Sequence, residues 1–395
     1  MAENGDIICR LSIQEIEQND EIEVNLIPER KGLFIKHVEY VVISQRFSSE
    51  VYRRYNDFAT FYDLLLCRFP YRLIPKLPPK KIVGVFPSDS NFLENRRKGL
   101  QRWLTLVARH PVIREDALLS FFLTQTVADL ASKMKDIFKS IPDEFTTSEL
   151  AAKARDLVPT NNTNDFATSR EQIRIIHNGV QKMKIIADQI ALRSHRYAAD
   201  MEDLGNTLTD LALDSVGRTS WGTGGNNSWS EIRRGFSIIS KEFSSLSTKA
   251  KEQSVLEEEQ VCERLNVLLE VLSGHQDLCE RVEKGVSHDH QVALSRMMAL
   301  KKRQIQGVLR GSDAASVATL ENRMLQQENV IASVELRTAF SLYCVRTETA
   351  LVHLYLETLA EILNSLVSVQ ISSHSELAQV WKVIQPTVVN CLPKK

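Results

Sequence analysis

No part of the sequence stays apolar for anything near eighteen consecutive residues, so we expect no segment that spans a membrane. The first twenty residues are acidic and contain no apolar signal core, which predicts a cytosolic protein. Positive charge is not in excess either. The 49 Lys and Arg residues stand against 50 Asp and Glu residues, which argues against a protein that coats nucleic acid. Six cysteines occur without a CxxC pair, so we expect reduced, mostly buried thiols rather than disulfides or a zinc site.

Signatures of catalysis and of nucleotide binding are missing as well. The segment Gly222-Thr223-Gly224-Gly225 lacks the Lys-Ser/Thr pair that completes a phosphate-binding loop, and neither GxSxG nor HExxH occurs. His288 and His290 are two positions apart, so their rings point to different faces of a helix and do not form a metal site. The sequence therefore predicts a protein that is not an enzyme and that uses no metal or other cofactor.

Proline and glycine are scarce in the second half of the chain. Nine of the eleven prolines lie at or before Pro159, the next is Pro386, and Gly311 is the last glycine. A proline-free run of this length is typical of a segment that is helical throughout. A chain of 395 residues has room for two or three domains. We expect a short tail over 1–18, a compact α+β domain over 19–125, a linker over 126–162, an all-α domain over 163–386 and a second tail over 387–395.

The first domain shows the patterns of a small sheet followed by helices. Ile22, Val24 and Leu26 alternate with polar residues, which predicts a β-strand. The segment Pro28–Gly32 predicts a turn, and residues 33–43 and 51–54 predict two more strands. A helix is expected from Asn56, a residue type that caps helices well, and another over about residues 90–109. Together these elements predict a three-stranded antiparallel sheet with helices.

The segment Arg53-Arg54-Tyr55-Asn56-Asp57-Phe58 stands where the third strand should meet the first helix. A guanidinium group binds phosphate with a fork of donors, and an aromatic ring packs under a sugar-like ring. The same residues also fit a solvated pair of arginines beside a core tyrosine. Arg96 leaves a similar choice open, because it interrupts an apolar helical stripe. Its side chain either extends to solvent or lines a polar pocket in the core.

The proline-rich loop that follows the first helix places Lys80 and Lys81 before four apolar residues, Ile82, Val83, Val85 and Phe86. These apolar residues either enter lipid, with the lysines on anionic headgroups, or fold back on the core. Between residues 53 and 114 there are thirteen Lys and Arg residues and four acids. A nearly neutral protein that concentrates cations in this way is expected to bind an anion there.

In their order and spacing, these parts of the first domain resemble a phox-homology (PX) domain. The resemblance implies that the domain binds phosphatidylinositol 3-phosphate. It places Arg54 on the 3-phosphate, Tyr55 under the inositol ring, Lys80 on the 1-phosphate and Arg96 on the ring hydroxyls. Lys81 is an adjacent alternative to Lys80.

The linker predicts a basic amphipathic helix of about four turns. Its apolar face comprises Val127, Leu130, Met134, Ile137 and Ile141. Its basic residues are Lys133, Lys135 and Lys139. The helix either lies as a wedge on a membrane surface or docks on one of the two domains.

The second domain shows the apolar spacing of a coiled coil. Apolar residues alternate steps of three and four from Ile173 to Leu211, with Ser194 as the one polar member. Two further helices are expected, one from Ser230 to about Leu309 and one that ends before Pro386. At 1.5 Å per residue the three helices would be roughly 65–75, 120 and 105 Å long.

Helices of such unequal length leave apolar stripes uncovered when they pack within one chain. A second copy of the chain buries these stripes in the simplest way, so we expect a two-fold homodimer. Gly274 and Gly285 are expected to permit bends in the second helix.

Four cations, Lys301, Lys302, Arg303 and Arg310, lie near the turn between the second and third helices. They are either an ordinary solvated charge run or a contact with an anionic membrane, where each contributes about 1 kcal/mol.

A three-helix coil behind a PX-like domain resembles the PX-BAR sorting nexins, over nearly the whole chain. This resemblance implies a peripheral protein of the early endosome membrane that senses or imposes curvature. It also implies a role in endosome-to-Golgi transport, with other trafficking proteins as further partners. The alternative is a signalling scaffold that phosphoinositides recruit and that does not remodel membranes.

Overall fold

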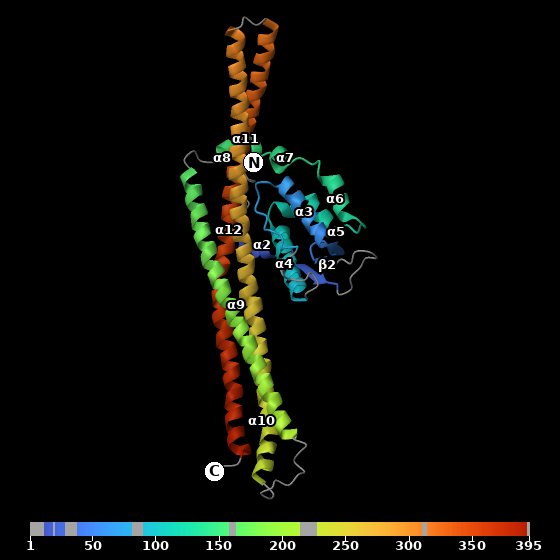
Figure 1. Cartoon of the computed structure of the whole chain (residues 1–395), viewed down its shortest axis with the longest axis vertical. Coiled ribbons are helices and arrows are strands. Elements are labelled where there is room, and N and C mark those ends of the chain that lie inside the picture. Colours follow the sequence, from blue (N-terminus) through green and yellow to red (C-terminus); the bar gives the residue numbers. More distant parts are fainter. Residues whose placement is uncertain are drawn as a thin grey trace. The chain divides into compact units, whose positions relative to one another are not determined.

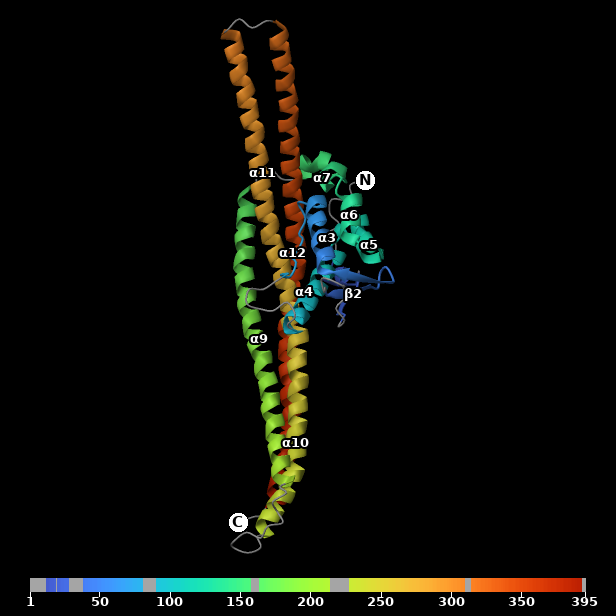
Figure 2. The ribbon, with the colours of Figure 1, turned by 45° about the vertical axis from the view of Figure 1, so that its right-hand side comes forward.

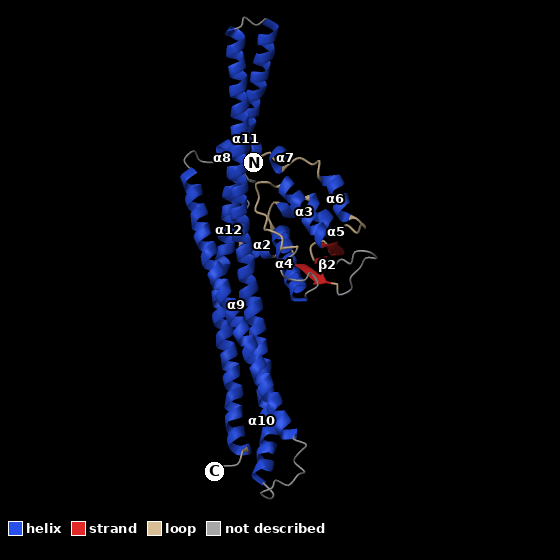
Figure 3. Ribbon diagram, in the orientation of Figure 1, coloured by secondary structure: helices blue, strands red, loops and turns tan. Residues whose placement is uncertain are grey.

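The structure is a computed structural model that describes residues 12–18, 20–27, 38–80, 90–157, 163–213, 227–309 and 314–392. The chain divides into two compact units by its internal contacts, and Figure 1 shows the helices and strands of the whole chain, coloured along the sequence. One unit comprises residues 1–177 and 269–356, and the other comprises residues 178–268 and 357–395. All described strands belong to the first unit, and the rest of the described regular structure is helical (Figure 3).

The strands form a three-stranded antiparallel sheet in the order β1-β2-β3, as predicted. Strand β1 spans Ile22–Leu26, β2 spans Glu39–Ser44 and β3 spans Ser49–Arg54. Val24 pairs with Val42, which pairs with Val51, and all three side chains are buried. The alternation of side chains along a strand therefore turns one face of the sheet into the core. The predicted turn at Pro28–Gly32 and residues 33–37 lie outside the described residues.

Helices cover the inner face of the sheet. They are α3 (Tyr55–Arg68), α4 (Ser90–Arg109), the 3₁₀ turn η1 (Ile113–Glu115) and α5 (Ala117–Thr124). Phe58, Phe61, Trp103 and Phe122 are fully buried, and the rings of Phe61 and Phe122 stack with centroids 4.3 Å apart. Phe58 and Phe61 thus lie on the buried face of α3, and Trp103 lies on that of α4.

The predicted cap of α3 is wrong by two residues. Asn56 lies inside the helix, and Arg54 is the N-cap residue. The helix begins earlier because the Asp57 carboxylate accepts a hydrogen bond from the Arg54 backbone N–H at 2.7 Å. An acidic side chain at the third helical position that reaches back to the cap is half of a capping box.

The linker helix is shorter than predicted. Helix α6 spans Leu130–Phe138, nine residues rather than four turns, and Asp129 caps it. Ile141 precedes Pro142, and a residue before proline is disfavoured in helical conformation. Leu130 and Met134 are buried in the same core as α3, whereas Ile137 remains 39% exposed. The structure therefore favours docking on the first domain over a free membrane wedge.

A short helix not expected from the sequence, α2 (Ile13–Glu17), begins the described chain. The Ser12 hydroxyl and the Glu15 carboxylate form a capping box, and Ile13 and Ile16 are buried. The signal was present in the sequence, since Ser-x-x-Glu is the pattern of that box.

Three short elements after α6 pack on the last long helix. They are α7 (Glu144–Thr147), η2 (Ala151–Lys153) and α8 (Ala154–Leu157). Ala151 and Ala154 join Phe340 and Tyr343 in one buried cluster, and the Phe145 and Phe340 rings lie 5.7 Å apart. The linker thus contacts both the sheet domain, through α6, and a long helix, through these turns.

The predicted long helices are present (Figure 2), but the second begins earlier and the third ends later than predicted. Helix α9 spans Thr163–Leu213. The second helix consists of α10 (Asn227–Glu257), a π-helical turn (Glu258–Cys262) and α11 (Glu263–Leu309), so it begins before Ser230. Its one break from α-helical geometry among the described residues is that π-turn, and α11 continues through both Gly274 and Gly285.

The third helix, α12 (Ala314–Cys391), continues through Pro386, so the predicted end before this residue is wrong. Proline lacks an N–H and normally ends a helix. Here the last turn is packed closely on α10. A Cβ at Gly235 would lie 2.6 Å from the Cys391 carbonyl oxygen and 2.8 Å from Leu392 Cδ2. This tertiary contact explains why the helix extends beyond the proline.

Several apolar side chains on the long helices are exposed. On α12, Leu363, Val367 and Ile371 are 44%, 55% and 68% exposed and follow each other at steps of four. Between Ala318 and Cys391 the same helix is long and apolar enough to cross a membrane by length and composition alone, a property that core helices of soluble proteins share. An apolar face at helical spacing is typical of a helix that packs against another helix.

The cysteines that the structure describes are unpaired, and the predicted burial holds for two of them. Cys262 and Cys344 are buried, and Cys67 is exposed.

Gly274 allows the loop before α4 to approach α11. A Cβ there would lie 3.1 Å from Leu73 Cδ2 and 3.4 Å from the Pro75 backbone. We expect Gly274→Leu to lower the free energy of unfolding by about 1–3 kcal/mol through overpacking. Gly274→Ala should have a smaller effect, because the gain in helix propensity opposes the contact. Denaturant titration of both variants tests this, and equal stability of Gly274→Leu and the wild type would contradict it. Gly285→Leu is the control, since nothing lies within 4 Å of a Cβ there.

Candidate functional site

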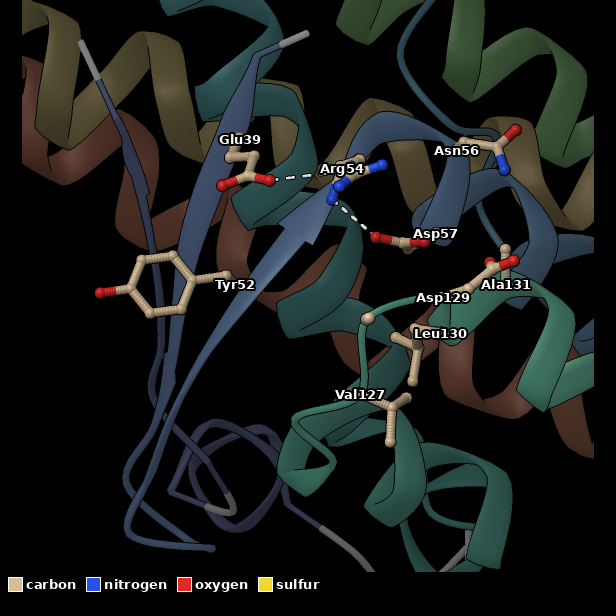
Figure 4. Close-up of a pocket in the computed structure, with 10 residues that line it drawn as sticks. Glu39, Tyr52, Arg54, Asn56, Asp57, Val127, Asp129, Leu130 and Ala131 are labelled. Carbon is tan, nitrogen blue, oxygen red and sulfur yellow. Dashed lines mark hydrogen bonds and ion pairs between the residues drawn. The ribbon is translucent and has the colours of Figure 1, made fainter. Parts of the chain in front are cut away.

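A cleft of about 570 Å³ opens where β3 ends and α3 begins (Figure 4). The start of α6 forms its other side. The residues that line it are Glu39, Tyr52, Arg54, Asn56, Asp57, Val127, Ala128, Asp129, Leu130 and Ala131. It contains one of the four residues that the resemblance placed on the headgroup, Arg54.

Strand alternation gives Arg53 and Arg54 opposite environments. Arg53 is 2% exposed and donates to the carbonyl oxygens of Phe122 (2.9 Å) and Gln125 (2.8 Å) at the end of α5. Burial lowers its pKa to about 10, so it remains protonated at neutral pH. The interpretation of both residues as a solvated pair is therefore wrong for Arg53, which stabilises the core.

Arg54 points the other way, into the cleft. Its side chain is 48% exposed, and its Nε lies 3.4 Å from a Glu39 carboxylate oxygen. Asn56 lies in the first turn of α3 and lines the same cleft. A guanidinium group beside the N-terminus of a helix favours an anion, because the first N–H groups and the helix dipole point toward it.

Tyr55, the Lys80 backbone and Arg96 form a second cluster. The Tyr55 hydroxyl donates to the Pro78 carbonyl oxygen at 2.5 Å, and burial raises the pKa of this hydroxyl. Arg96 is 8% exposed and donates to the Tyr40 hydroxyl at 2.7 Å and to the Lys80 carbonyl oxygen at 3.3 Å. The interpretation of Arg96 as a side chain that extends to solvent is therefore wrong.

Aromatic rings surround the Arg96 guanidinium. Its Cζ lies 5.1 Å from the ring centroid of Phe92, 5.4 Å from that of Tyr55 and 5.7 Å from that of Tyr40. Cation–π attraction of this kind fixes the arginine in place. The Tyr55 ring and the Arg96 guanidinium group therefore lie together. Arg54 is next to Tyr55 in the sequence, and its side chain lines the cleft.

Gly99 positions the loop that carries Lys80, a role that was not predicted from the sequence. A Cβ at this position would lie 3.0 Å from Pro78 Cβ, so glycine lets the loop approach α4. A glycine within an apolar helical stripe, one turn after a buried arginine, was the available signal.

The remaining predicted contact residues are surface residues or are not described. Lys133, Lys135 and Lys139 near α6 are exposed, as are Lys301, Lys302 and Arg303 on α11. Lys80 is exposed. Lys81, Ile82, Val83, Val85, Phe86 and Arg310 lie outside the described residues.

A group of potential metal ligands occurs on the helices. The ligand atoms of Asp188, Glu258 and Cys262 lie within 4.8 Å of one another. Burial raises the pKa of Cys262 to about 12, so its thiol is protonated at neutral pH. Binding of a metal ion there would have to displace the thiol proton.

Comparison with known proteins identifies both parts of the chain. Residues 41–126 match the PX domain, and residues 139–391 match the sorting nexin 8/Mvp1 BAR domain. Sorting nexin-8 of Mus musculus is 43% identical over 392 residues, which cover 99% of this chain and 84% of that protein. Sorting nexin-8 of Homo sapiens is 41% identical over 392 residues, with coverages of 99% and 83%.

A solved structure has the same fold. The cryo-EM structure of the SNX-BAR Mvp1 tetramer superposes with a TM-score of 0.69, at 20% sequence identity. The match covers 92% of this chain and 99% of that one.

Proposed function

Because this chain belongs to the sorting nexins that join a PX domain to a BAR domain of the sorting nexin 8/Mvp1 type, we propose that it binds phosphatidylinositol 3-phosphate on endosomes. In this proposal a BAR homodimer senses or induces membrane curvature, and the protein acts in endosomal sorting and endosome-to-Golgi transport. The family consists of non-enzymatic adaptors that bind membranes in trafficking.

The position of Arg54 is the main support for the proposed lipid binding. It is a half-exposed cation at the start of a helix, within a cleft, and its partner Glu39 lies at the long distance of 3.4 Å. A phosphate offers this guanidinium two strong acceptors, and charge-assisted bonds of that kind are among the strongest in proteins. In the proposal Tyr55 packs against the inositol ring, Lys80 meets the 1-phosphate and Arg96 bonds the ring hydroxyls.

Exposed apolar residues on the long helices support the homodimer. Leu363, Val367 and Ile371 form one uncovered stripe on α12, and Leu204 and Leu211 of α9 are 40% and 41% exposed. Burial of such side chains against a second copy is favourable by about 25 cal/mol per Å² of apolar surface. The related Mvp1 protein assembles as a tetramer.

The exposed cations on α11 supply the second proposed membrane contact. In this proposal an anionic bilayer attracts the exposed side chains of Lys301, Lys302 and Arg303. A dimer carries two lipid sites and two such groups of cations. Because all four weak contacts can form at once, the dimer binds the membrane more strongly than any single contact would.

Charge reversal on α11 tests whether the protein remodels membranes. We expect Lys301→Glu, Lys302→Glu and Arg303→Glu in one variant to abolish tubulation of anionic liposomes, because the reversed residues repel the bilayer. Electron microscopy of the liposomes measures the effect. The corresponding glutamine triple variant should give an intermediate result if the contact is electrostatic. Full tubulation by the glutamate variant would contradict the proposal and favour a lipid-recruited signalling scaffold.

A further inference from the structure

The end of α11 and the start of α12 lie side by side (Figure 1 and Figure 2). The Gln327 side-chain amide donates to the Ala293 carbonyl oxygen at 2.9 Å, which fixes the two helices to each other. We call residues 290–309 and 314–334 the arm. Ala293 and Met297 of α11 are buried within it, at 3% and 7% exposed. These two residues mark the packed side of α11 in the arm.

A second side of α11 in the arm is apolar but exposed. Leu294, Met298 and Ile305 are 36%, 65% and 63% exposed, and we call them the open stripe. Their spacing of four and seven residues places them on one face, about a quarter turn from the packed side. Lys301 lies between Met298 and Ile305 on the same face. Single exposed apolar residues are ordinary, whereas several on one face indicate a contact surface.

The sequence around the open stripe is basic. From His290 to Arg310 it contains five Lys and Arg residues and no Asp or Glu residue. Lys301, Lys302 and Arg303 are exposed there. The start of α12 carries both signs of charge, so the excess of cations belongs to α11. A helix face of apolar residues bordered by lysine and arginine is typical of a surface that lies in the headgroup region of an anionic bilayer.

A second copy of the chain matches the open stripe less well. Two such faces would bring like charges together, and like charges repel. The apolar residues of α12 that support the homodimer, Leu363, Val367 and Ile371, also lie far along that helix from Gln327, which bonds to Ala293. The open stripe is therefore separate from the proposed dimer contact.

We infer that the open stripe of Leu294, Met298 and Ile305 inserts between the headgroups of an anionic bilayer. The neighbouring cations stay at the level of the headgroups. The inference rests on the proposed function, because it assumes that the cations of α11 meet a membrane. It adds an apolar contact, whose strength increases with the buried apolar area and depends on membrane curvature.

Two double substitutions separate apolar contact from the exact shape of the side chains. Met298→Gln with Ile305→Gln removes apolar surface at exposed positions and introduces good helix formers. Met298→Leu with Ile305→Leu keeps the apolar surface. Val330→Gln is the matched control, because Val330 is an apolar residue of the same arm, 43% exposed, on α12.

Co-sedimentation of the full chain with vesicles measures the contact. The vesicles contain phosphatidylcholine, phosphatidylserine and phosphatidylinositol 3-phosphate. Binding is measured in about 0.1 M and about 1 M salt, between which the Debye length falls from about 10 Å to about 3 Å. The glutamine double variant should bind about tenfold more weakly than the wild type at both salt concentrations, because salt does not screen apolar burial. The leucine double variant and Val330→Gln should match the wild type.

The possible results separate the inference from the proposed function. Equal binding of the glutamine double variant and the wild type overturns the inference, and so does a difference that disappears in high salt. A change in self-association of the glutamine double variant without vesicles, seen by analytical ultracentrifugation, also overturns it, in favour of a second copy. Failure of the wild type to bind the vesicles in low salt overturns the proposed function instead.

Thermal unfolding curves show whether each variant is folded. Should the glutamine double variant unfold, the single variants Met298→Gln and Ile305→Gln repeat the test. Each should bind about threefold more weakly than the wild type, because the effects of separated sites add as free energies. Wild-type binding by both single variants would overturn the inference.

Discussion

Replacement of Glu348 with alanine should lower the free energy of unfolding by about 3–5 kcal/mol, the largest stability effect that we expect from one substitution. Glu348 of α12 is fully buried. One carboxylate oxygen accepts from Arg72 Nη1 at 3.0 Å, and the other lies 3.0 Å from His110 Nε2. Removal of the carboxylate leaves a buried guanidinium group with one anionic partner fewer.

The same network joins three parts of the chain. Arg72, 4% exposed, also pairs with Glu144 of the linker at 2.6 Å. Arg72 and His110 belong to the PX domain, and Glu348 belongs to a BAR helix. His110 Nδ1 accepts from the backbone N–H groups of Val112 and Ile113, so the ring carries its proton on Nε2 and donates it to Glu348. The network therefore fixes the PX domain to α12 by paired, buried polar groups.

Acid should weaken this network. Burial acts to raise the pKa of Glu348, but His110 and Arg72 outweigh it and hold the pKa below its usual 4.5. A depressed carboxyl pKa contributes stability that is present above pH 4.5 and is lost as the pH falls through the lower, folded-state value. The wild type should therefore lose stability in acid, and Glu348→Ala should lose less.

Denaturant titrations followed by tryptophan fluorescence check both effects. The control is Glu361→Ala on the same helix, whose ion pair with Arg264 is exposed and contributes about 0–1 kcal/mol. A Glu348→Ala protein as stable as the Glu361→Ala protein would show that the network does not stabilise the fold.

Replacement of Arg54 with alanine should weaken binding to 3-phosphoinositide liposomes by about 10- to 100-fold, the range for loss of hydrogen bonds to a charged group. Stability should change little, since the side chain is half-exposed and its contact with Glu39 is long. Liposome sedimentation measures binding, with Lys153→Ala as the exposed control. Unchanged sedimentation of Arg54→Ala would refute the assignment of this residue to the phosphate.

Local patterns in the sequence predict much of the fold. The alternation of Ile22 and Val24 identifies β1, and the absence of proline identifies the long helices. The two arginines of the motif were not distinguished, and the structure shows Arg53 buried and Arg54 half-exposed. Failures occur where distant residues decide the local structure. The contact of Gly235 with the end of α12 keeps Pro386 within a helix, and Gly274 serves close packing on Pro75 rather than a bend.

The site was predictable only in part. Arg54 and Tyr55 stand in a motif, and Arg96 interrupts a helical stripe, so each gives a local signal. Glu39 and Asp129 give none, because each looks like an ordinary surface acid until β2 and α6 bring them to the cleft. The partners of Arg72 are likewise invisible in sequence, since Glu144 and Glu348 lie far from it along the chain.

Membrane attachment of the proposed kind requires the PX cleft and the BAR helices to act on one bilayer at the same time. The direct measurement is sedimentation of the wild-type protein with small and large liposomes, each with and without phosphatidylinositol 3-phosphate. We predict binding that depends on the lipid and is stronger on the small liposomes. Equal binding to all four preparations would contradict this account.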